Sequence, residues 1–205
     1  MKNRIPGTLV LTATVVAAGC GGAKHAPTTS AATTAPPTSQ ATPTSTSPGA
    51  LQAEAGSAAT GDIPDNQVYL AFRSKKGWSI KYPEGWAQSG SPDATIFRDK
   101  NNIVRIVIRP GKAPAAAQVR HDPSLRAARI TTAPTTMSVK GSRAIKVVYT
   151  TQSAPNSVTG KRVTLTVDRY YLATGGMVAT IDLGTPVGVD NVDAYRLMIE
   201  SFRWR

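Results

Sequence analysis

Cys20 is the residue whose type and position point most directly to chemistry. It is the only cysteine in the chain, and it follows a basic start, with Lys2 and Arg4, and an apolar run over residues 5–18. A positive start, a short apolar run and small residues before a cleavage point are features of a secretory signal. The run has about 14 residues, whereas a helix that crosses a bilayer needs about 20. We therefore predict that residues 1–19 are a signal peptide.

The residues around this cysteine, AAGCGG over positions 17–22, resemble the lipobox of bacterial lipoproteins. The resemblance implies cleavage between Gly19 and Cys20 and attachment of a diacylglyceryl group to the thiol. It places the protein on the extracytoplasmic face of the cell membrane, held there by a lipid anchor. The chain has Ala17 where that family prefers Leu or Val, and a plain secretory peptide with an incidental cysteine is the alternative.

Other residues that could catalyse a reaction or bind a metal are scarce. His25 falls in a low-complexity stretch, so His121 is the only histidine in the remainder of the chain. With Cys20 lipidated, no disulfide or cysteine metal site can form within one chain. The sequence also lacks the G-x-S-x-G, H-E-x-x-H, P-loop and G-x-G-x-x-G motifs. We expect no enzyme, cofactor or metal site, and a hydrolase with an unrecognised site is the alternative. His121-Asp122 could be half of a catalytic dyad, but its place at a predicted helix break favours an exposed loop histidine.

Two acidic residues and two tryptophans allow both a structural and a functional interpretation. Asp182 is expected opposite Arg169 in a hairpin, which favours a cross-strand ion pair over an acid/base pair with Asp168. Trp78 and Trp86 could line a ligand groove, but strand and turn signals surround them. Core packing is therefore the expected role of both tryptophans.

The charge of the chain is strongly positive. From Asp62 onward there are 21 basic and 11 acidic residues, a net charge of +10. The predicted export argues against nucleic acid, so anionic lipid, an acidic wall polymer or an acidic protein face are the expected partners. The densest basic run holds Arg73, Lys75 and Lys76, which we expect in a loop and consider the candidate anion-binding residues. Charge that serves only solubility is the alternative.

Composition divides the chain into three parts. Residues 20–61 are rich in Ala, Thr, Pro and Ser and hold few large apolar side chains, so we predict a disordered linker. Similar linkers in actinobacterial lipoproteins are O-mannosylated, and a bare spacer is equally compatible. Residues 62–205 are long enough for one compact domain, which we expect to be a monomer.

Alternating apolar residues predict strands over 78–82, 94–99, 103–109, 135–139 and 143–152. The clearest hairpin joins residues 161–172 to 177–184 through Gly175-Gly176, which supply the positive φ of a tight turn. This turn would place Tyr170 opposite Ile181. Apolar residues on both faces of 103–109 and of 161–172 predict a sheet that is covered on both sides, with a bulge near residues 168–169 as the alternative.

Three helical segments are predicted. Residues 113–121 are rich in alanine, and Asp122-Pro123 resembles a helix cap, with a second helical piece through Arg129. A last helix would begin at an Asp190 N-cap, with Val192 leading an apolar stripe that continues through residues 195, 198, 199 and 202. We expect Trp204 to dock on the domain.

The match WSIKYPEGW over residues 78–86 resembles the opening of PsbP-like and DcrB-like domains, and SFRW over 201–204 resembles their close. Lipoproteins of the LpqN type pair a lipobox with such a domain. The resemblance covers residues 67–205 and implies an α+β fold, a PsbP-like α/β/α sandwich around an antiparallel sheet with the C-terminal helix docked on it.

These observations favour a membrane-anchored lipoprotein of the cell envelope. We expect a non-catalytic accessory module that binds a protein partner or an envelope component. A lipid-binding or lipid-transport protein is the alternative, and it would need an apolar cavity between sheet and helices that is large enough for an acyl chain.

Overall fold

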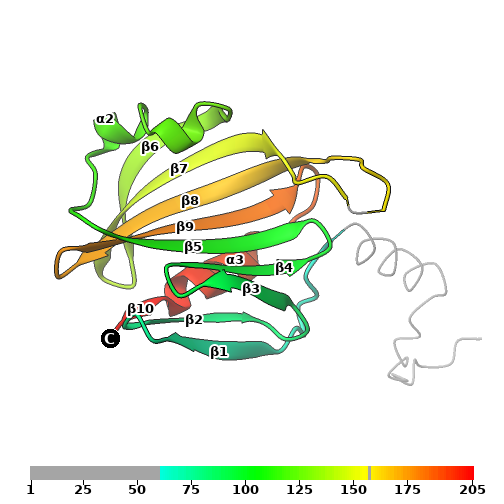
Figure 1. Cartoon of the computed structure of the whole chain (residues 1–205), viewed down its shortest axis with the longest axis horizontal. Helices are drawn as coiled ribbons and strands as arrows, with labels where there is room; N and C mark the ends of the chain where they lie inside the picture. The colour runs from blue at the N-terminus through cyan, green and yellow to red at the C-terminus, as the bar shows by residue number, and fades with distance from the viewer. Residues whose placement is uncertain (1–60, 157) are drawn as a thin grey trace, which may run out of the picture. The chain divides into compact units, whose positions relative to one another are not determined.

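A computed structural model describes residues 61–156 and 158–205 (Figure 1). The predictions for the signal peptide, for Gly19 and Cys20 and for almost all of the linker therefore lie outside the described residues. The described part holds two antiparallel sheets and a helix near its C-terminal end. The α+β class that the sequence predicts is confirmed.

The larger sheet has seven strands in the order β3-β4-β5-β9-β8-β7-β6. The strands are β3 (Ala87–Ser91), β4 (Ala94–Asp99), β5 (Asn102–Pro110), β6 (Arg129–Val139), β7 (Ser142–Gln152), β8 (Thr164–Thr174) and β9 (Met177–Pro186). The β8–β9 hairpin has the predicted register, with Tyr170 opposite Ile181, and its pairing runs without a shift. Gly175 and Gly176 form its turn with φ values of 52° and 78°.

Both faces of this sheet are buried, so two-sided burial and not a bulge explains the apolar pattern. One face, which includes Ile106, Leu172 and Ile181, packs under helix α3 (Val192–Ser201) and the smaller sheet. The other face, which includes Val147 and Val167, packs under two short segments. These are helix α2 (Ala116–Val119) and the 3₁₀ turn η1 (Pro123–Leu125).

The smaller sheet has the order β1-β2-β10, with β1 (Tyr69–Ser74), β2 (Trp78–Pro83) and β10 (Arg203–Trp204). Trp204 pairs with Trp78, so the expected docking of Trp204 is confirmed. Trp78 is fully buried and Trp86 is 8% exposed, so both are core residues, as predicted.

Several local predictions were wrong. The helix predicted over 113–121 is reduced to the four residues of α2, and the piece expected through Arg129 ends at Leu125. Helices this short gain little from their own hydrogen bonds and depend on tertiary contacts. The strand predicted over 135–139 begins at Arg129. Its first half was not predicted because the first five residues are all exposed and the register with β7 shifts around Thr132, so no alternation marks it.

Strands β1 and β3 were not predicted. All five residues of β3 are exposed and none is β-branched, so no alternation marks this strand. Its pairing with β4 is made possible by Gly90, which has φ +93° and would place a Cβ 2.0 Å from the carbonyl oxygen of Ala94. Only glycine fits there.

Helix α3 also differs from the prediction at its start. The N-cap is Asn191 and not Asp190, although the Asp190 carboxylate accepts a hydrogen bond from the backbone N–H of Val192 at 3.2 Å. Val192 is 71% exposed, because it occupies the first helical position and contributes nothing to the buried stripe. The stripe itself, which includes Tyr195, Met198 and Ile199, is buried as predicted.

Candidate anion-binding groove

The outer face of the small sheet carries a row of basic side chains. Side chains alternate between the two faces of a strand. In β2 this alternation turns Trp78 and Ile80 toward the core. Ser79 and Lys81 therefore face outward. Cross-strand pairing places Arg73 of β1 and Arg203 of β10 on either side of Ser79, on the same outer face.

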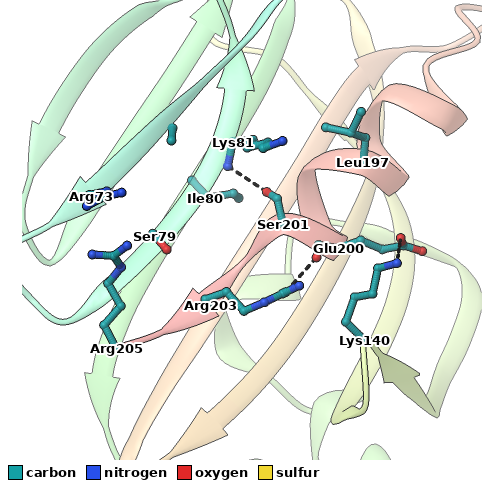
Figure 2. Close-up of a pocket in the computed structure, with 11 residues that line it drawn as sticks. Arg73, Ser79, Ile80, Lys81, Lys140, Leu197, Glu200, Ser201, Arg203 and Arg205 are labelled. Carbon is teal, nitrogen blue, oxygen red and sulfur yellow. Dashed lines mark hydrogen bonds and ion pairs between the residues drawn. The ribbon is translucent and has the colours of Figure 1, made fainter.

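This face forms the floor of a groove of about 420 Å³ (Figure 2). One wall is the last turn of α3, with Leu197, Glu200 and Ser201, and Lys140 of the β6–β7 turn completes it. The wall is fixed to the floor by a hydrogen bond of 2.7 Å from the backbone N–H of Lys81 to the Ser201 hydroxyl. The lining residues are Ala71, Arg73, Ser79, Ile80, Lys81, Lys140, Leu197, Glu200, Ser201, Arg203 and Arg205.

Five of these residues are cations and one is an acid, so the groove is positive. Lys140 pairs with Glu200 at 3.1 Å. Arg203 Nη1 donates to the carbonyl oxygens of Glu200 and Phe202 at 2.8 and 2.6 Å, which satisfies acceptors at the end of α3.

Three further cations of the groove are unengaged. Within residues 61–156 and 158–205, the side chains of Arg73, Lys81 and Arg205 make no hydrogen bond or ion pair. The backbone N–H of Arg205 donates to the carbonyl of Gly77 at 2.7 Å, which holds this residue beside the start of β2. The three side chains are therefore free to bind an anion.

The basic run singled out in the sequence is divided by the fold. Arg73 lies in β1, not in the expected loop, and it lines the groove. Lys75 lies in the turn that follows and lines a different hollow, about 270 Å³, beside β3. Lys76 forms an ion pair with Asp93 at 2.9 Å. Arg73 also lines this second hollow, but Lys75 and Lys76 do not line the groove, so the three residues of the run do not share one site.

Sequence reasoning missed Lys81, Arg203 and Arg205 as members of the groove. The outward position of Lys81 could have been predicted, since the alternation of residues 78–82 already turns it away from the core. The positions of Arg203 and Arg205 could not have been predicted, because these residues meet β2 only through β10, a strand of two residues near the end of the chain.

A second polar site is buried on the face of the large sheet that packs under α2 and η1. The predicted pair is confirmed: Arg169 Nε and Nη2 donate to the two carboxylate oxygens of Asp182 at 2.5 and 3.0 Å. Arg169 also donates to the hydroxyls of Tyr149 at 3.2 Å and Ser124 at 2.6 Å. Burial opposes the charge of Arg169, but Asp182 outweighs burial and raises the pKa of the guanidinium.

The same site holds the loop that the sequence offered as half of a dyad. Asp122 accepts hydrogen bonds from the Tyr171 hydroxyl at 2.6 Å and from the backbone N–H of Ser124 at 2.8 Å. Burial opposes ionisation, but these hydrogen bonds hold the pKa of Asp122 below its usual value. His121 is exposed in the adjacent turn, and the contacts of Asp122 go elsewhere. The site therefore ties η1 to the sheet.

Asp168 and Asp182 do not form an acid/base pair. Asp182 shares a face with its partner Arg169, so the neighbouring Asp168 points to the other face of the sheet. There Asp168 binds Lys146 at 2.6 Å. Among the described residues, no group of three or more His, Cys, Asp or Glu side chains could hold a metal ion.

A smaller cavity lies beside the buried pair. It measures about 150 Å³ and has an apolar floor that includes Ile103, Leu165 and Val167. Ligand pockets usually measure about 300 to 1,000 Å³, so this cavity does not favour the lipid-handling alternative. None of the helices in the described part of the chain has the length and hydrophobicity to cross a bilayer.

No protein-family model matches this chain, and no curated protein matches it. Among solved structures, it is similar to cyanobacterial PsbP (CyanoP) from Synechocystis sp. PCC 6803, with a TM-score of 0.49, 16% identity and coverage of 72% of this chain and 99% of that chain. It is also similar to a crystal structure from Bacteroides thetaiotaomicron VPI-5482, with a TM-score of 0.45, 15% identity and coverage of 66% of this chain. The match spans 48% of the length of that second chain.

Proposed function

We propose that this protein is a lipoprotein of the cell envelope whose folded domain is a non-catalytic accessory module that binds an anionic envelope component. The observation that carries the proposal is the groove, where the unpaired side chains of Arg73, Lys81 and Arg205 line one concave surface.

Electrostatics supports this choice of ligand. A cleft lined by charge of one sign concentrates its field and raises the local concentration of ligands of the opposite sign. The net charge of +10 over residues 62–205 adds a long-range attraction for the same ligands. An anionic partner is thus favoured both at a distance and on contact.

The anchor follows from the sequence around Cys20. A single acyl chain binds membranes only marginally, whereas two hold stably, so a diacylglyceryl group would suffice. The domain would then meet anionic ligands of the envelope at the membrane that holds it.

The anchor is tested by replacing Cys20 with alanine and separating cells into membrane and soluble fractions. We expect the wild-type chain and a Gly22→Ala control in the membrane fraction, because both keep the thiol. The Cys20→Ala chain should be released into the medium or remain unprocessed. Mass spectrometry that finds an unmodified Cys20 in membrane-bound protein would refute the anchor.

Anion binding is tested on the full chain carrying Cys20→Ala, so that no lipid contributes. The probes are anionic vesicles, a glycerol-phosphate oligomer, polyglutamate and neutral dextran. We expect binding to at least one anionic probe and none to dextran, with affinity that falls as salt rises. The proposed function would be rejected if the protein bound none of the anionic probes at low ionic strength, or if salt did not weaken the binding.

A further inference from the structure

We infer that the groove recognises phosphate esters, and that its ligand is a flexible linear polymer with phosphodiester links that lies along β2. This inference rests on the proposed function and narrows its ligand to one chemical class. It concerns the row of Arg73, Ser79 and Arg203 and the two cations on either side of that row, Lys81 and Arg205 (Figure 2).

The row across the sheet forms a slot for one anion. Arg73 and Arg203 both pair with Ser79, from opposite neighbouring strands. Neighbouring strands lie about 4.8 Å apart, so the Cα atoms of the two arginines are about 10 Å apart with a small side chain between them. Arg203 uses Nη1 on backbone carbonyls, which leaves its Nε and Nη2 donors for a ligand.

Arg73 and Arg203 flank the Ser79 hydroxyl, and donors on both sides of a central hydroxyl suit phosphate better than carboxylate. One guanidinium fork satisfies a planar carboxylate by itself. The oxygens of a tetrahedral phosphate point in several directions, so they can accept from two arginines and from the Ser79 hydroxyl below them. The small floor residues Ser79 and Ala71 leave room for the anion between the arginines.

The remaining cations extend the slot into a line. Lys81 lies two residues from Ser79 along β2, and Arg205 lies two residues from Arg203 in the opposite sense along the sheet. Two residues of a strand span about 6.7 Å. The groove therefore offers positive charge at three successive positions with a regular step. A polymer with one charge per short repeat matches this step, whereas a compact anion would use only one position.

The shape of the groove argues against the flat surface of a bilayer as the ligand. The cations of the sheet face lie on the floor, and the wall above them carries Leu197 and Glu200. A flat bilayer would meet this wall, where Leu197 is apolar and the charge of Glu200 is paired with Lys140, so the wall adds no unpaired positive charge. A flexible chain can enter the groove and reach the floor.

The lining also argues against nucleic acid. Proteins that bind single strands stack bases on aromatic side chains. No aromatic side chain lines this groove, and Trp78 and Trp204 belong to the opposite, core-facing side of the small sheet. The phosphates are thus recognised without any site for bases.

The test measures binding by calorimetry with the full chain carrying Cys20→Ala. The probes are a glycerol-phosphate oligomer, polyglutamate of equal charge, phosphatidylglycerol vesicles, a single-stranded oligonucleotide and inorganic phosphate. We expect the glycerol-phosphate oligomer to bind at least about tenfold more tightly than every other probe, a difference of about 1.4 kcal/mol.

The groove is identified by the double variant Arg73→Gln/Lys81→Gln. Both side chains lack partners among the described residues, so their loss should leave the fold unchanged. The matched control, Arg120→Gln/Arg126→Gln, removes the same charge from exposed positions outside the groove. We expect the groove variant to weaken binding of the oligomer about tenfold or more and to lower its salt dependence, and the control to change affinity by less than about twofold.

Several results would overturn the inference while leaving the proposed function intact. Equal or tighter binding of polyglutamate would show that charge alone is recognised. Tighter binding of vesicles or of the oligonucleotide would assign the site to a membrane or to nucleic acid. Equal losses in the groove variant and the control would show that the ligand does not use the groove. Failure of every anionic probe would instead reject the proposed function.

Discussion

The face of the large sheet on which a residue lies decides which side chains it contacts. Arg169 and Asp168 are adjacent in β8, yet one joins a buried network with Asp182 and the other binds Lys146 on the opposite face. Buried ion pairs are costly to break, because the remaining charge is left without a partner. The Arg169 network therefore holds η1 on the sheet together with Leu125, which is buried in the apolar cluster of the same face.

Asp122 makes this network sensitive to acid. Its pKa in the folded state is lower than its usual value of about 3.9, so the folded state binds a proton less readily than the unfolded chain. The stability that ionised Asp122 contributes is present above about pH 4 and is lost as pH falls through the lower folded-state pKa. We predict that Asp122→Asn is less stable than wild type near neutral pH and that the difference shrinks below about pH 4.

Urea unfolding at a series of pH values measures this difference. Tyr171→Phe is the informative control, because it removes one hydrogen bond that lowers the pKa of Asp122 and leaves the carboxyl group in place. It should flatten the acid dependence partly. A difference between wild type and Asp122→Asn that stays constant through the acid range would contradict the prediction.

At the scale of elements, close packing between neighbouring strands depends on Gly184 in β9. This residue lies opposite Ile103 of β5 and Val167 of β8. A Cβ added there would lie 2.8 Å from Cγ2 of Ile103 and 3.3 Å from Cγ2 of Val167. Both neighbours are β-branched and cannot easily rotate away.

We predict that Gly184→Ala lowers the free energy of unfolding by about 1 to 3 kcal/mol, the usual cost of overpacking. Part of the cost is offset by the smaller backbone entropy of alanine in the unfolded chain. The double variant Gly184→Ala/Ile103→Ala should show a favourable coupling in a double-mutant cycle, because the second change removes the nearest methyl group. Additive effects of the two changes would argue against a clash.

Over the whole molecule, one core joins the two sheets. The fully buried ring of Phe97 in β4 stacks on Tyr82 of the small sheet at 4.2 Å and meets Phe72 edge-on at 5.3 Å. All three tryptophans belong to this core or pack against it. The small sheet, and with it the floor of the groove, is therefore expected to unfold together with the large sheet.

We predict that Phe97→Ala destabilises the domain by about 3 to 5 kcal/mol through the cavity it leaves. Tryptophan fluorescence and far-ultraviolet circular dichroism should report one coincident transition in urea, for wild type and variant alike. The control Ile130→Ala, in edge strand β6 and 36% exposed, should stay within about 0.5 kcal/mol of wild type. Two separate transitions would show that the sheets fold independently.

Much of the large sheet could be predicted from local patterns. Alternation in β5 and β8 marks two buried faces, and Gly175-Gly176 marks the turn that sets the register of Arg169 and Asp182. The same patterns failed for β1 and β3, whose residues show little alternation, and for α2, which is too short to carry a periodic signal. At the site, only Arg73 was among the predicted residues that line the groove.

The sequence by itself determined the α+β class, the central hairpin and the buried stripe of α3, because each depends on side chains close together in the chain. Only the tertiary structure decided where the cations meet. Arg203 and Arg205 reach Arg73 and Lys81 through the pairing of β10 with β2, more than 120 positions away in the chain. Such a pairing is chosen by the shared core beneath both strands, and no local pattern encodes it.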